Sequence, residues 1–444
     1  ARAWLRARAG SVSVVLGTRS AIFTPLPRAG IIIVDEEHDS AYKQQDGFRY
    51  HARDLALVRG RALEVPVVLG SGTPSLESLA NAEAGRYQTL HLRARPGALR
   101  PPQVEIIDMR AQHLEHGMSP ALLTAIAQTL ERGEQALVFR NRRGYAPVLL
   151  CHACGWHADC PRCERPLTLH ARARQLVCHH CDFRQRVMAE CPSCGSAELT
   201  AQGQGTERLE EALLAHFPQV PILRVDRETT QRRDAFAGLL AQLDDERPAI
   251  LVGTQMLAKG HDLPNLTLVA IVGVDEGLHS VDFRASERLA QLVVQVAGRA
   301  GRARKPGRVL LQTHKPQHPL LRDLLAQGYA ATARELLVER RLSDLPPCSH
   351  QVLLRAEAPT RAAVDVFLAA ARAALPVASG LQVAGPMPAP MPLRAGRHRG
   401  QLLLESTQRP TLRAMLRPWW LALHALPAGR RVRWSLDVDP IDLY

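Results

Sequence analysis

The sequence predicts an α/β protein built on parallel sheets, with a cysteine-rich insertion and a smaller α+β domain at its end. Three observations support this prediction. Short apolar segments alternate with helical stretches over most of the chain, eight of the nine cysteines lie between Cys151 and Cys194, and residues 351–437 read as strands and helices in the order βαββαβ. A length of 444 residues corresponds to about three domains.

Composition narrows the class of protein. Hydrophobic residues make up 46% of the chain and charged residues 22%, which supports folded cores and excludes intrinsic disorder. The longest apolar run, residues 266–274, contains Thr267 and is too short to span a bilayer, so we expect no membrane helix. No secretory signal is apparent, and we expect a cytoplasmic protein. The net charge of +13 favours an anionic partner such as nucleic acid.

Two α/β units are predicted before the last domain. In residues 1–95, the β-branched segments 12–16, 31–34 and 67–69 are typical of strands in a parallel sheet that is buried on both faces. A proline-rich linker follows at residues 93–102. The second unit begins over residues 96–144 and resumes over 201–342, on either side of a cysteine-rich insertion at 145–200. Its strands are expected at residues 104–107, 136–139, 222–225, 250–252, 267–272 and 308–312.

The insertion contains four C-x-x-C pairs, a spacing that presents two thiolates to one zinc ion. Residues 167–170 and 175–177 read as a hairpin, which would bring Cys160 and Cys163 beside Cys178 and Cys181. The remaining pairs, Cys151 with Cys154 and Cys191 with Cys194, would then form a second, enclosing site. The alternative, which joins the first two pairs, leaves only a short connection between them and is less favourable. We expect two structural zinc ions, each with four cysteine ligands.

The last domain, residues 343–444, has the element order of a ferredoxin-like α+β fold. Its strands are expected at residues 351–357, 381–384, 401–405 and 431–437, and its helices at 361–375 and 410–424. The segment between the two middle strands is rich in proline and then in arginine, and it reads as a loop.

Four polar motifs follow predicted strands or helices in a fixed order. Strand 31–34 runs into DEEH, residues 35–38, where one carboxylate can hold Mg²⁺ and its neighbour can orient the attacking water in phosphoryl transfer. SGTPS spans residues 71–75, and GTQMLAKGHD follows strand 250–252. QVAGRAGR, residues 295–302, places two arginines three apart, and we expect them on one face of a short helix, where they could stabilise a transferring phosphoryl group.

This ordered set resembles the superfamily 2 helicases, which have two RecA-like lobes. Further strings are YKQQDGFRYHARDLA (residues 42–56), GTERLEE (205–211), VDFRASER (281–288) and WSLDVDPID (434–442). Together with the eight cysteines, they resemble the primosomal protein N′ (PriA) family of bacterial replication-restart helicases over essentially the whole chain. The resemblance implies an incomplete first RecA-like lobe, a second RecA-like lobe, a two-zinc insertion of zinc-ribbon type and a ferredoxin-like C-terminal domain.

The resemblance also implies roles for single residues. Asp35 would coordinate Mg²⁺, Glu36 would activate water, and His38 would couple hydrolysis to DNA. Ser71 and Thr73 would have a similar role in coupling hydrolysis to DNA, although the family more often has alanine at the position of Gly72. The residues implied to line the nucleotide cleft from the second lobe are Gly253, Thr254, Asp262, Gln295, Arg299 and Arg302, with Arg302 preferred as the arginine finger.

DNA contacts are implied at two places. The loop 42–50 looks like the aromatic-rich loop that senses single-stranded DNA in the family. Its aromatic side chains can stack on bases and its basic side chains can meet phosphates; these residues are Tyr42, Lys43, Phe48, Arg49 and Tyr50. In the last domain, Arg397, Arg399 and Gln401 are candidates for binding DNA or the single-stranded-DNA-binding protein.

One part of a helicase motor is missing from the sequence. None of the four lysines, Lys43, Lys259, Lys305 and Lys315, lies in the motif G-x-x-x-x-G-K-[ST] that holds nucleotide phosphates. The family places that motif upstream, behind an N-terminal DNA-binding domain. We therefore expect a C-terminal fragment of a longer protein, without efficient ATP hydrolysis.

Two functions fit these observations. The first is an ATP-dependent 3′→5′ DNA helicase that recognises and remodels stalled or abandoned forks. With the single-stranded-DNA-binding protein and other primosome proteins, it would promote primosome assembly and loading of the replicative helicase. The second is a non-catalytic zinc- and DNA-binding scaffold for primosome assembly.

Overall fold

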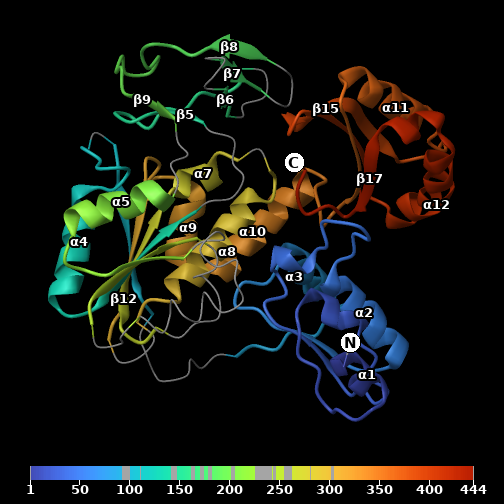
Figure 1. Cartoon of the computed structure of the whole chain (residues 1–444), viewed down its shortest axis with the longest axis horizontal. Helices are drawn as coiled ribbons and strands as arrows, with labels where there is room; N and C mark the ends of the chain where they lie inside the picture. Colours follow the sequence, from blue (N-terminus) through green and yellow to red (C-terminus); the bar gives the residue numbers. More distant parts are fainter. Residues whose placement is uncertain are drawn as a thin grey trace. The chain divides into compact units, whose positions relative to one another are not determined.

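The computed structural model describes residues 2–92, 101–110, 112–141, 148–161, 166–170, 175–178, 183–201, 206–225, 243, 247–254, 263–280, 282–301 and 305–443. The chain divides into two compact units (Figure 1). The first unit combines Ala1–Gln88 with Leu336–Tyr444, and the second unit is Thr89–Glu335. The two ends of the sequence, which we assign to separate domains, therefore share one unit.

The N-terminal part of the first unit is a small β–α–β arrangement. Strand β1 (Ile32–Val34) pairs in parallel with β2 (Val67–Leu69), and helix α2 (Ala52–Leu63) connects them. Gly60 lets the helix approach the sheet, because a Cβ there would lie 2.2 Å from a methyl carbon of Val67. The expected strand at residues 12–16 is wrong. Among the described residues it has no strand to pair with, and Leu16 is 97% exposed.

The other N-terminal elements are short helices. These are α1 (Arg2–Arg8), the 3-10 turns η1 (Arg19–Phe23) and η2 (Ser40–Tyr42), and α3 (Leu76–Glu83). Helix α3 begins at the end of the SGTPS turn, where the Ser75 hydroxyl accepts a hydrogen bond from the Ser78 amide and so caps the helix. The turn is thereby held next to the end of β2.

The second unit contains a six-stranded, wholly parallel sheet, as predicted. Its order is β10 (Ile222–Val225), β11 (Ala249–Gly253), β4 (Gln135–Arg140), β12 (Leu266–Val272), β13 (Arg308–Thr313) and β3 (Gln103–Asp108). All six predicted strands are confirmed to within one residue. Every residue of β4 and β12 is buried, because a parallel sheet is covered on both faces.

Helices cover this sheet. Helices α4 (Pro120–Glu131) and α5 (Thr206–His216) share one apolar cluster with β4, β11 and β12. Helix α8 (Ala285–Ala297) contacts β12, and α7 (Val274–Leu278) directly follows that strand. Helices α9 (Pro319–Gln327) and α10 (Tyr329–Leu342) come after the last strand of the sheet.

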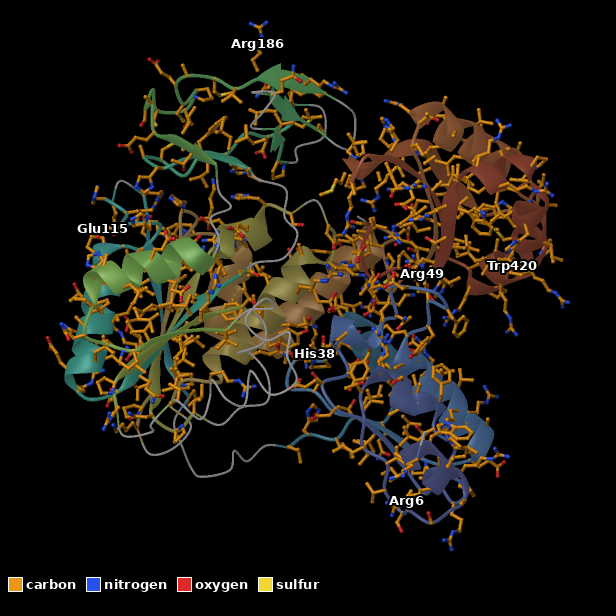
Figure 2. All side chains as sticks on the ribbon, in the orientation of Figure 1. Arg6, His38, Arg49, Glu115, Arg186 and Trp420 are labelled. Carbon is orange, nitrogen blue, oxygen red and sulfur yellow. The ribbon has the colours of Figure 1, made fainter. Side chains whose placement is uncertain are left out.

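The cysteine-rich insertion contains two small antiparallel sheets. Strand β5 (Leu149–Cys151) pairs with β9 (Leu199–Ala201). The predicted hairpin is confirmed as β6 (Thr168–His170) with β7 (Gln175–Val177), and β8 (Arg184–Arg186) adds a third strand. On β8, Arg184 and Arg186 are exposed, and Arg186 points away from the module (Figure 2).

The C-terminal domain has the predicted ferredoxin-like topology. Its elements are β14 (His350–Ala358), α11 (Arg361–Ala373), β15 (Gln382–Arg394), β16 (Arg397–Ser406), α12 (Arg409–Ala425), η4 (Pro427–Arg431) and β17 (Arg433–Val438). The sheet order is β15-β16-β14-β17, with all neighbours antiparallel. The core lies between this sheet and the two helices, around Phe367 and Trp419.

The expected loop between the two middle strands is wrong, because it is a hairpin whose first strand, β15, extends to Arg394. The four prolines of this segment occupy every second position from 386 to 392. Strand β15 lies at the edge of the sheet, where a missing backbone N–H on the solvent side breaks no ladder hydrogen bond. Pro386 and Pro388 are exposed accordingly.

Within the described residues, no helix combines the length and the hydropathy that a membrane crossing requires.

Candidate active site and zinc centre

The DEEH motif lies at the carboxyl end of β1, where the parallel strand predicts it. Asp35 follows the strand directly, and its carboxylate accepts a hydrogen bond from the Glu36 amide at 3.0 Å. Glu36 has a left-handed backbone, with φ of 48°, and its side chain is exposed. Both carboxylates are thus available at the strand end, and carboxylate oxygens are the ligands that Mg²⁺ prefers.

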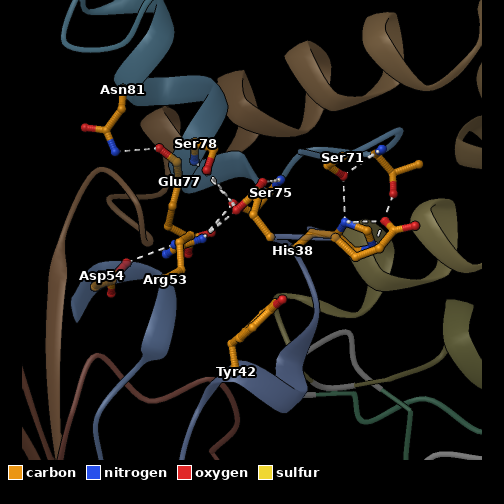
Figure 3. A network of polar contacts seen from close by, with 12 residues as sticks. His38, Tyr42, Arg53, Asp54, Ser71, Ser75, Glu77, Ser78 and Asn81 are labelled. Atoms are coloured by element: carbon orange, nitrogen blue, oxygen red, sulfur yellow. Dashed lines mark hydrogen bonds and ion pairs between the residues drawn. The ribbon is translucent and has the colours of Figure 1, made fainter. Parts of the chain in front are cut away.

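His38 connects this motif to the SGTPS turn. Its Nδ1 lies 2.6 Å from the Ser71 hydroxyl, and its Nε2 lies 3.5 Å from the Thr73 hydroxyl (Figure 3). The same Nδ1 lies 3.5 Å from the Glu36 carboxylate. The imidazole therefore touches both the glutamate expected to handle water and the turn expected to couple hydrolysis to DNA.

A second network, which the sequence did not predict, lies directly behind this site. Glu37 is 1% exposed, and its carboxylate accepts hydrogen bonds from the Ser75 amide at 2.7 Å and the Ser75 hydroxyl at 3.0 Å. The Arg53 guanidinium lies 3.1 Å from the same carboxylate. Burial opposes the charge of Arg53, but three neighbouring carboxylates, that of Asp54 foremost, outweigh it and raise the Arg53 pKa. The hydrogen bonds between Ser75 and Glu37 fix the SGTPS turn to the DEEH motif, and Arg53 neutralises the buried Glu37 charge.

A sequence signal for this network does exist. DEEH contains two glutamates, and only one of them can face solvent if the strand end turns sharply. Arg53 also stands in the string that carries the resemblance, at the start of α2.

The aromatic-rich loop, residues 42–50, contains a ring platform. Phe48 is 76% exposed and stacks on Tyr50, with 5.8 Å between ring centroids, and Tyr50 meets Phe23 edge-on at 4.8 Å. Tyr42 is placed differently, since its hydroxyl donates to the Asp35 carbonyl at 2.6 Å. Burial, followed by the charge of Asp35, raises the pKa of Tyr42.

The expectation that Lys43 meets DNA phosphates is wrong for this structure. Lys43 is 2% exposed, and its ammonium lies 2.8 Å from the Asp437 carboxylate. A basic side chain that is buried and paired in this way cannot reach a nucleic-acid backbone. Arg49 lies 3.9 Å from the same carboxylate, but its side chain is 18% exposed, and it remains a candidate for phosphate contact.

The second unit supplies the other candidate cleft residues, and the structure places the described ones at the end of β11 and at the end of α8. Gly253 is buried at the end of β11, and Thr254 follows it with its amide donating to the Val225 carbonyl. Gln295 lies in the last turns of α8. Asp262 and Arg302 fall outside the described residues.

The expected helix face for the two arginines is wrong, because α8 ends at Ala297 and Arg299 lies, 8% exposed, in the turns that follow. Gly301 explains this geometry. It has φ of 69°, its amide donates to the Leu266 carbonyl, and a Cβ there would lie 2.4 Å from the backbone nitrogen of Gly307. The turn is therefore pinned beside the start of β12, which a continuing helix would not permit.

The structure brings together the four cysteines that the nested pairing assigns to the outer site. The sulfur atoms of Cys151, Cys154, Cys191 and Cys194 all lie within 4.8 Å of one another. Two of the sulfur–sulfur distances are 3.6 and 3.7 Å. Tetrahedral zinc with Zn–S bonds of about 2.3 Å requires sulfurs about 3.8 Å apart, so these four thiols fit a zinc ion closely.

The inner site is only partly described. Cys160 and Cys178 are buried in one apolar cluster with Leu167 and Leu176, on the confirmed hairpin. Cys163 and Cys181 lie outside the described residues. The second zinc ion therefore remains a prediction.

The outer knuckle packs on the carboxyl end of the second unit's sheet, which the sequence did not predict. His152 Nδ1 lies 3.1 Å from His314 Nε2, and His314 Nδ1 lies 2.8 Å from the Asp275 carboxylate. Burial alone would raise the pKa of Asp275, but the hydrogen bond and charge of His314 outweigh it and lower that pKa. Gly155, with φ of 74°, permits this approach because a Cβ would lie 2.6 Å from the His314 carbonyl.

The candidate residues of the last domain lie on β16. Arg397 pairs with Glu357 at 3.3 Å, and burial lowers the pKa of Arg399. Gln401 is 5% exposed, so the expectation that it contacts a partner is wrong. Arg397 and Arg399 remain candidates.

The fold and these motifs define a helicase-type α/β protein that carries a zinc-ribbon insertion. Three family models match it: the helicase conserved C-terminal domain over residues 174–304, the PriA DNA helicase Cys-rich region domain over 160–186, and the primosomal protein N C-terminal domain over 341–441. The chain belongs to the PriA family of replication restart proteins.

Curated relatives support this assignment over nearly the whole chain. Each is named replication restart protein PriA. The protein from Haemophilus influenzae is 50% identical over 99% of this chain and 60% of its own length. Those from Bacillus subtilis and Rickettsia felis are each 37% identical over 98% of this chain, and over 55% and 67% of their own lengths. The chain thus spans little more than half of the length of the first two relatives.

Proposed function

We propose that this chain supplies part of the motor core, the zinc module and the C-terminal domain of an ATP-dependent 3′→5′ DNA helicase that acts in replication restart. Such an enzyme recognises and remodels stalled or abandoned forks in the cytoplasm and promotes primosome assembly and loading of the replicative helicase. The observation that carries the proposal is the His38 contact network. One imidazole joins the DEEH carboxylates to the SGTPS turn, and a non-catalytic α/β scaffold has no need for that connection.

In this proposal the strand-end carboxylates divide the chemistry. Asp35 would hold Mg²⁺ and Glu36 would orient the attacking water, and ATP with Mg²⁺, when bound, would supply the phosphoryl group and the charge that activates it. Gly253, Thr254, Asp262 and Gln295 would line the nucleotide site from the second lobe. Arg299 and Arg302 would stabilise charge on the transferring group, a role worth about 10³–10⁵ in rate for an arginine finger.

DNA contacts are assigned to the aromatic platform and to the partly exposed Arg49, Arg397 and Arg399. An exposed ring such as Phe48 can stack on any base, which suits recognition without sequence preference. Tyr42 then provides a direct connection to the motor, because its hydroxyl holds the Asp35 carbonyl. The predicted partners are forked and single-stranded DNA, the single-stranded-DNA-binding protein and other primosome proteins.

This chain itself is proposed to hydrolyse ATP poorly, because its four lysines all lie outside a phosphate-cradling motif. That same observation favours a second candidate function, a non-catalytic zinc- and DNA-binding scaffold for primosome assembly. The two candidates differ in what Glu36 does, since a scaffold does not require it.

The test uses the full-length protein that contains this segment. We expect Glu36→Gln or Arg302→Ala to abolish unwinding of a forked duplex while leaving fork binding within two-fold, about 0.4 kcal/mol, of the unmodified protein. Glu64→Gln, an exposed glutamate at the end of α2, is the matched control and should unwind normally. Unwinding that survives Glu36→Gln would contradict the catalytic assignment and favour the scaffold.

A further inference from the structure

The aromatic-rich loop is fastened to the last strand of the C-terminal domain by a buried ion pair. Lys43 and Asp437 are each 2% exposed, and their charged groups lie 2.8 Å apart. Lys43 Nζ also donates to the Val438 carbonyl at 2.6 Å and to the Asp439 carbonyl at 3.2 Å. One ion pair and two hydrogen bonds thus hold the ammonium at the end of β17, although Asp437 lies 394 positions after Lys43 in the sequence.

Asp437 is held in place from its own domain. It stands opposite Leu353 in the register of β14 and β17, and Arg355 of β14 lies 3.4 Å from its carboxylate. Arg355 in turn lies 3.0 Å from Asp442, beyond the end of the strand. The sheet of the C-terminal domain therefore fixes the position of the Asp437 carboxylate, and the ion pair places Lys43 relative to that sheet.

The loop side of the pair leads directly to the candidate active site. Lys43 follows Tyr42, whose hydroxyl holds the Asp35 carbonyl at 2.6 Å. Beyond Lys43, the amide of Gln44 donates to the Tyr50 carbonyl and closes the loop beneath the Phe48 platform. The position of Lys43 thus sets both ends of the loop, the end that touches the motor and the end that carries the exposed ring.

We propose that Asp437 is a positioning residue for the aromatic-rich loop, so that the C-terminal domain sets the loop geometry through which single-stranded DNA is sensed. A buried ion pair contributes little net stability but discriminates strongly between arrangements, because a partner left alone is a buried, uncompensated charge. The DNA-sensing part rests on the proposed function. The positioning part rests only on the contacts described here.

The experiment measures hydrogen exchange of the loop amides and binding of a labelled oligothymidine 20-mer by this chain. Four variants are compared: Asp437→Asn, Lys43→Met, the two combined, and Arg341→Ala. Arg341→Ala is the matched control. It removes the ion pair between Arg341 and Glu83, which also connects residues 336–444 to residues 1–88 but lies away from the loop.

We expect each single variant to speed exchange of the Gln44 amide about ten-fold, which corresponds to about 1.4 kcal/mol, and to weaken oligothymidine binding. The combined variant should give well under a hundred-fold, because the two changes share the Lys43–Asp437 pair and their effects on it are not additive. Exchange of the amides at the centre of β14 should stay unchanged in all variants, and exchange of the Gln44 amide should stay unchanged in the Arg341→Ala control. If Asp437→Asn does not fold, Lys43→Met still provides the test, because methionine keeps the apolar part of the lysine side chain and removes its charged group.

Two outcomes would overturn the inference: loop exchange that does not change in either single variant, or effects that multiply in the combined variant. Phe48→Ala separates the inference from the proposed function. If Phe48→Ala leaves oligothymidine binding intact, the DNA role assigned to the loop fails, whereas the exchange data still decide whether Asp437 positions it.

Discussion

Acid is expected to lower the free energy of unfolding of the first unit through His51. This residue occupies the N-cap position of α2, and its backbone forms an antiparallel β-bridge with Lys43 at the base of the aromatic-rich loop. Burial, followed by the charge of Arg53, lowers the pKa of His51 from 6.5 to about 4. Its Nδ1 is also buried without a hydrogen-bond partner among the described residues. The folded state therefore resists protonation that the unfolded state accepts.

The sign and size follow from linkage. Because the folded-state pKa is the lower one, the unfolded chain binds the proton first as the pH falls, and stability is lost between about pH 6.5 and pH 4. At about 1.36 kcal/mol per pKa unit, the loss between pH 7.5 and pH 5 is about 2 kcal/mol.

The assay is urea unfolding at these two pH values for the unmodified chain and for His51→Gln, which keeps a polar side chain but cannot titrate. Other ionisable groups act equally in both proteins, so the difference between the two pH dependences isolates His51. We expect the unmodified chain to lose about 2 kcal/mol more than the variant. Equal losses would refute the argument that His51 is buried in its neutral form.

Three further results are expected. Zinc analysis should find two ions per chain, and Cys191→Ser should leave one that resists mild chelation; a single ion in the unmodified chain would contradict the nested sites. Gly301→Ala should lower the free energy of unfolding by about 1–3 kcal/mol, since its φ is 69° and its Cβ would meet backbone, whereas Gly298→Ala should change it little. Arg53→Met should cost about 3–5 kcal/mol in urea unfolding because Glu37 is left buried and unpaired, and Glu37→Gln in addition should recover part of that loss.

The strands of the second unit could be predicted because burial on both faces leaves a continuous apolar run in the sequence. All six appear where such runs occur. The same signal failed at residues 12–16, because an apolar run reports hydrophobicity and not the presence of a neighbouring strand. The prediction of a loop where β15 lies failed for the opposite reason. Its prolines suggest a loop, and only its position at the sheet edge makes alternating prolines compatible with a strand.

The candidate site was predictable where it is local in sequence. DEEH follows β1 directly, and the hairpin between the middle cysteine pairs predicts the grouping of the outer four sulfurs, which lie close together. Long-range contacts were not predictable. Nothing near Lys43 indicates that its charge is neutralised by Asp437, and nothing near Cys154 indicates a histidine pair against the sheet. Lysine in a loop beside aromatic residues has the same local pattern whether it meets a phosphate or a distant carboxylate.

ATP turnover by this chain should be measured with and without forked DNA, together with fork binding on the same sample. We expect tight binding and negligible turnover, because the loop proposed to contact DNA and the cysteine-rich module are present while none of the four lysines lies in a phosphate-cradling motif. Turnover that forked DNA stimulates and that Glu36→Gln abolishes would contradict the proposed lack of ATP hydrolysis. Failure to bind forked DNA would contradict the assignment of this chain to a fork-remodelling helicase.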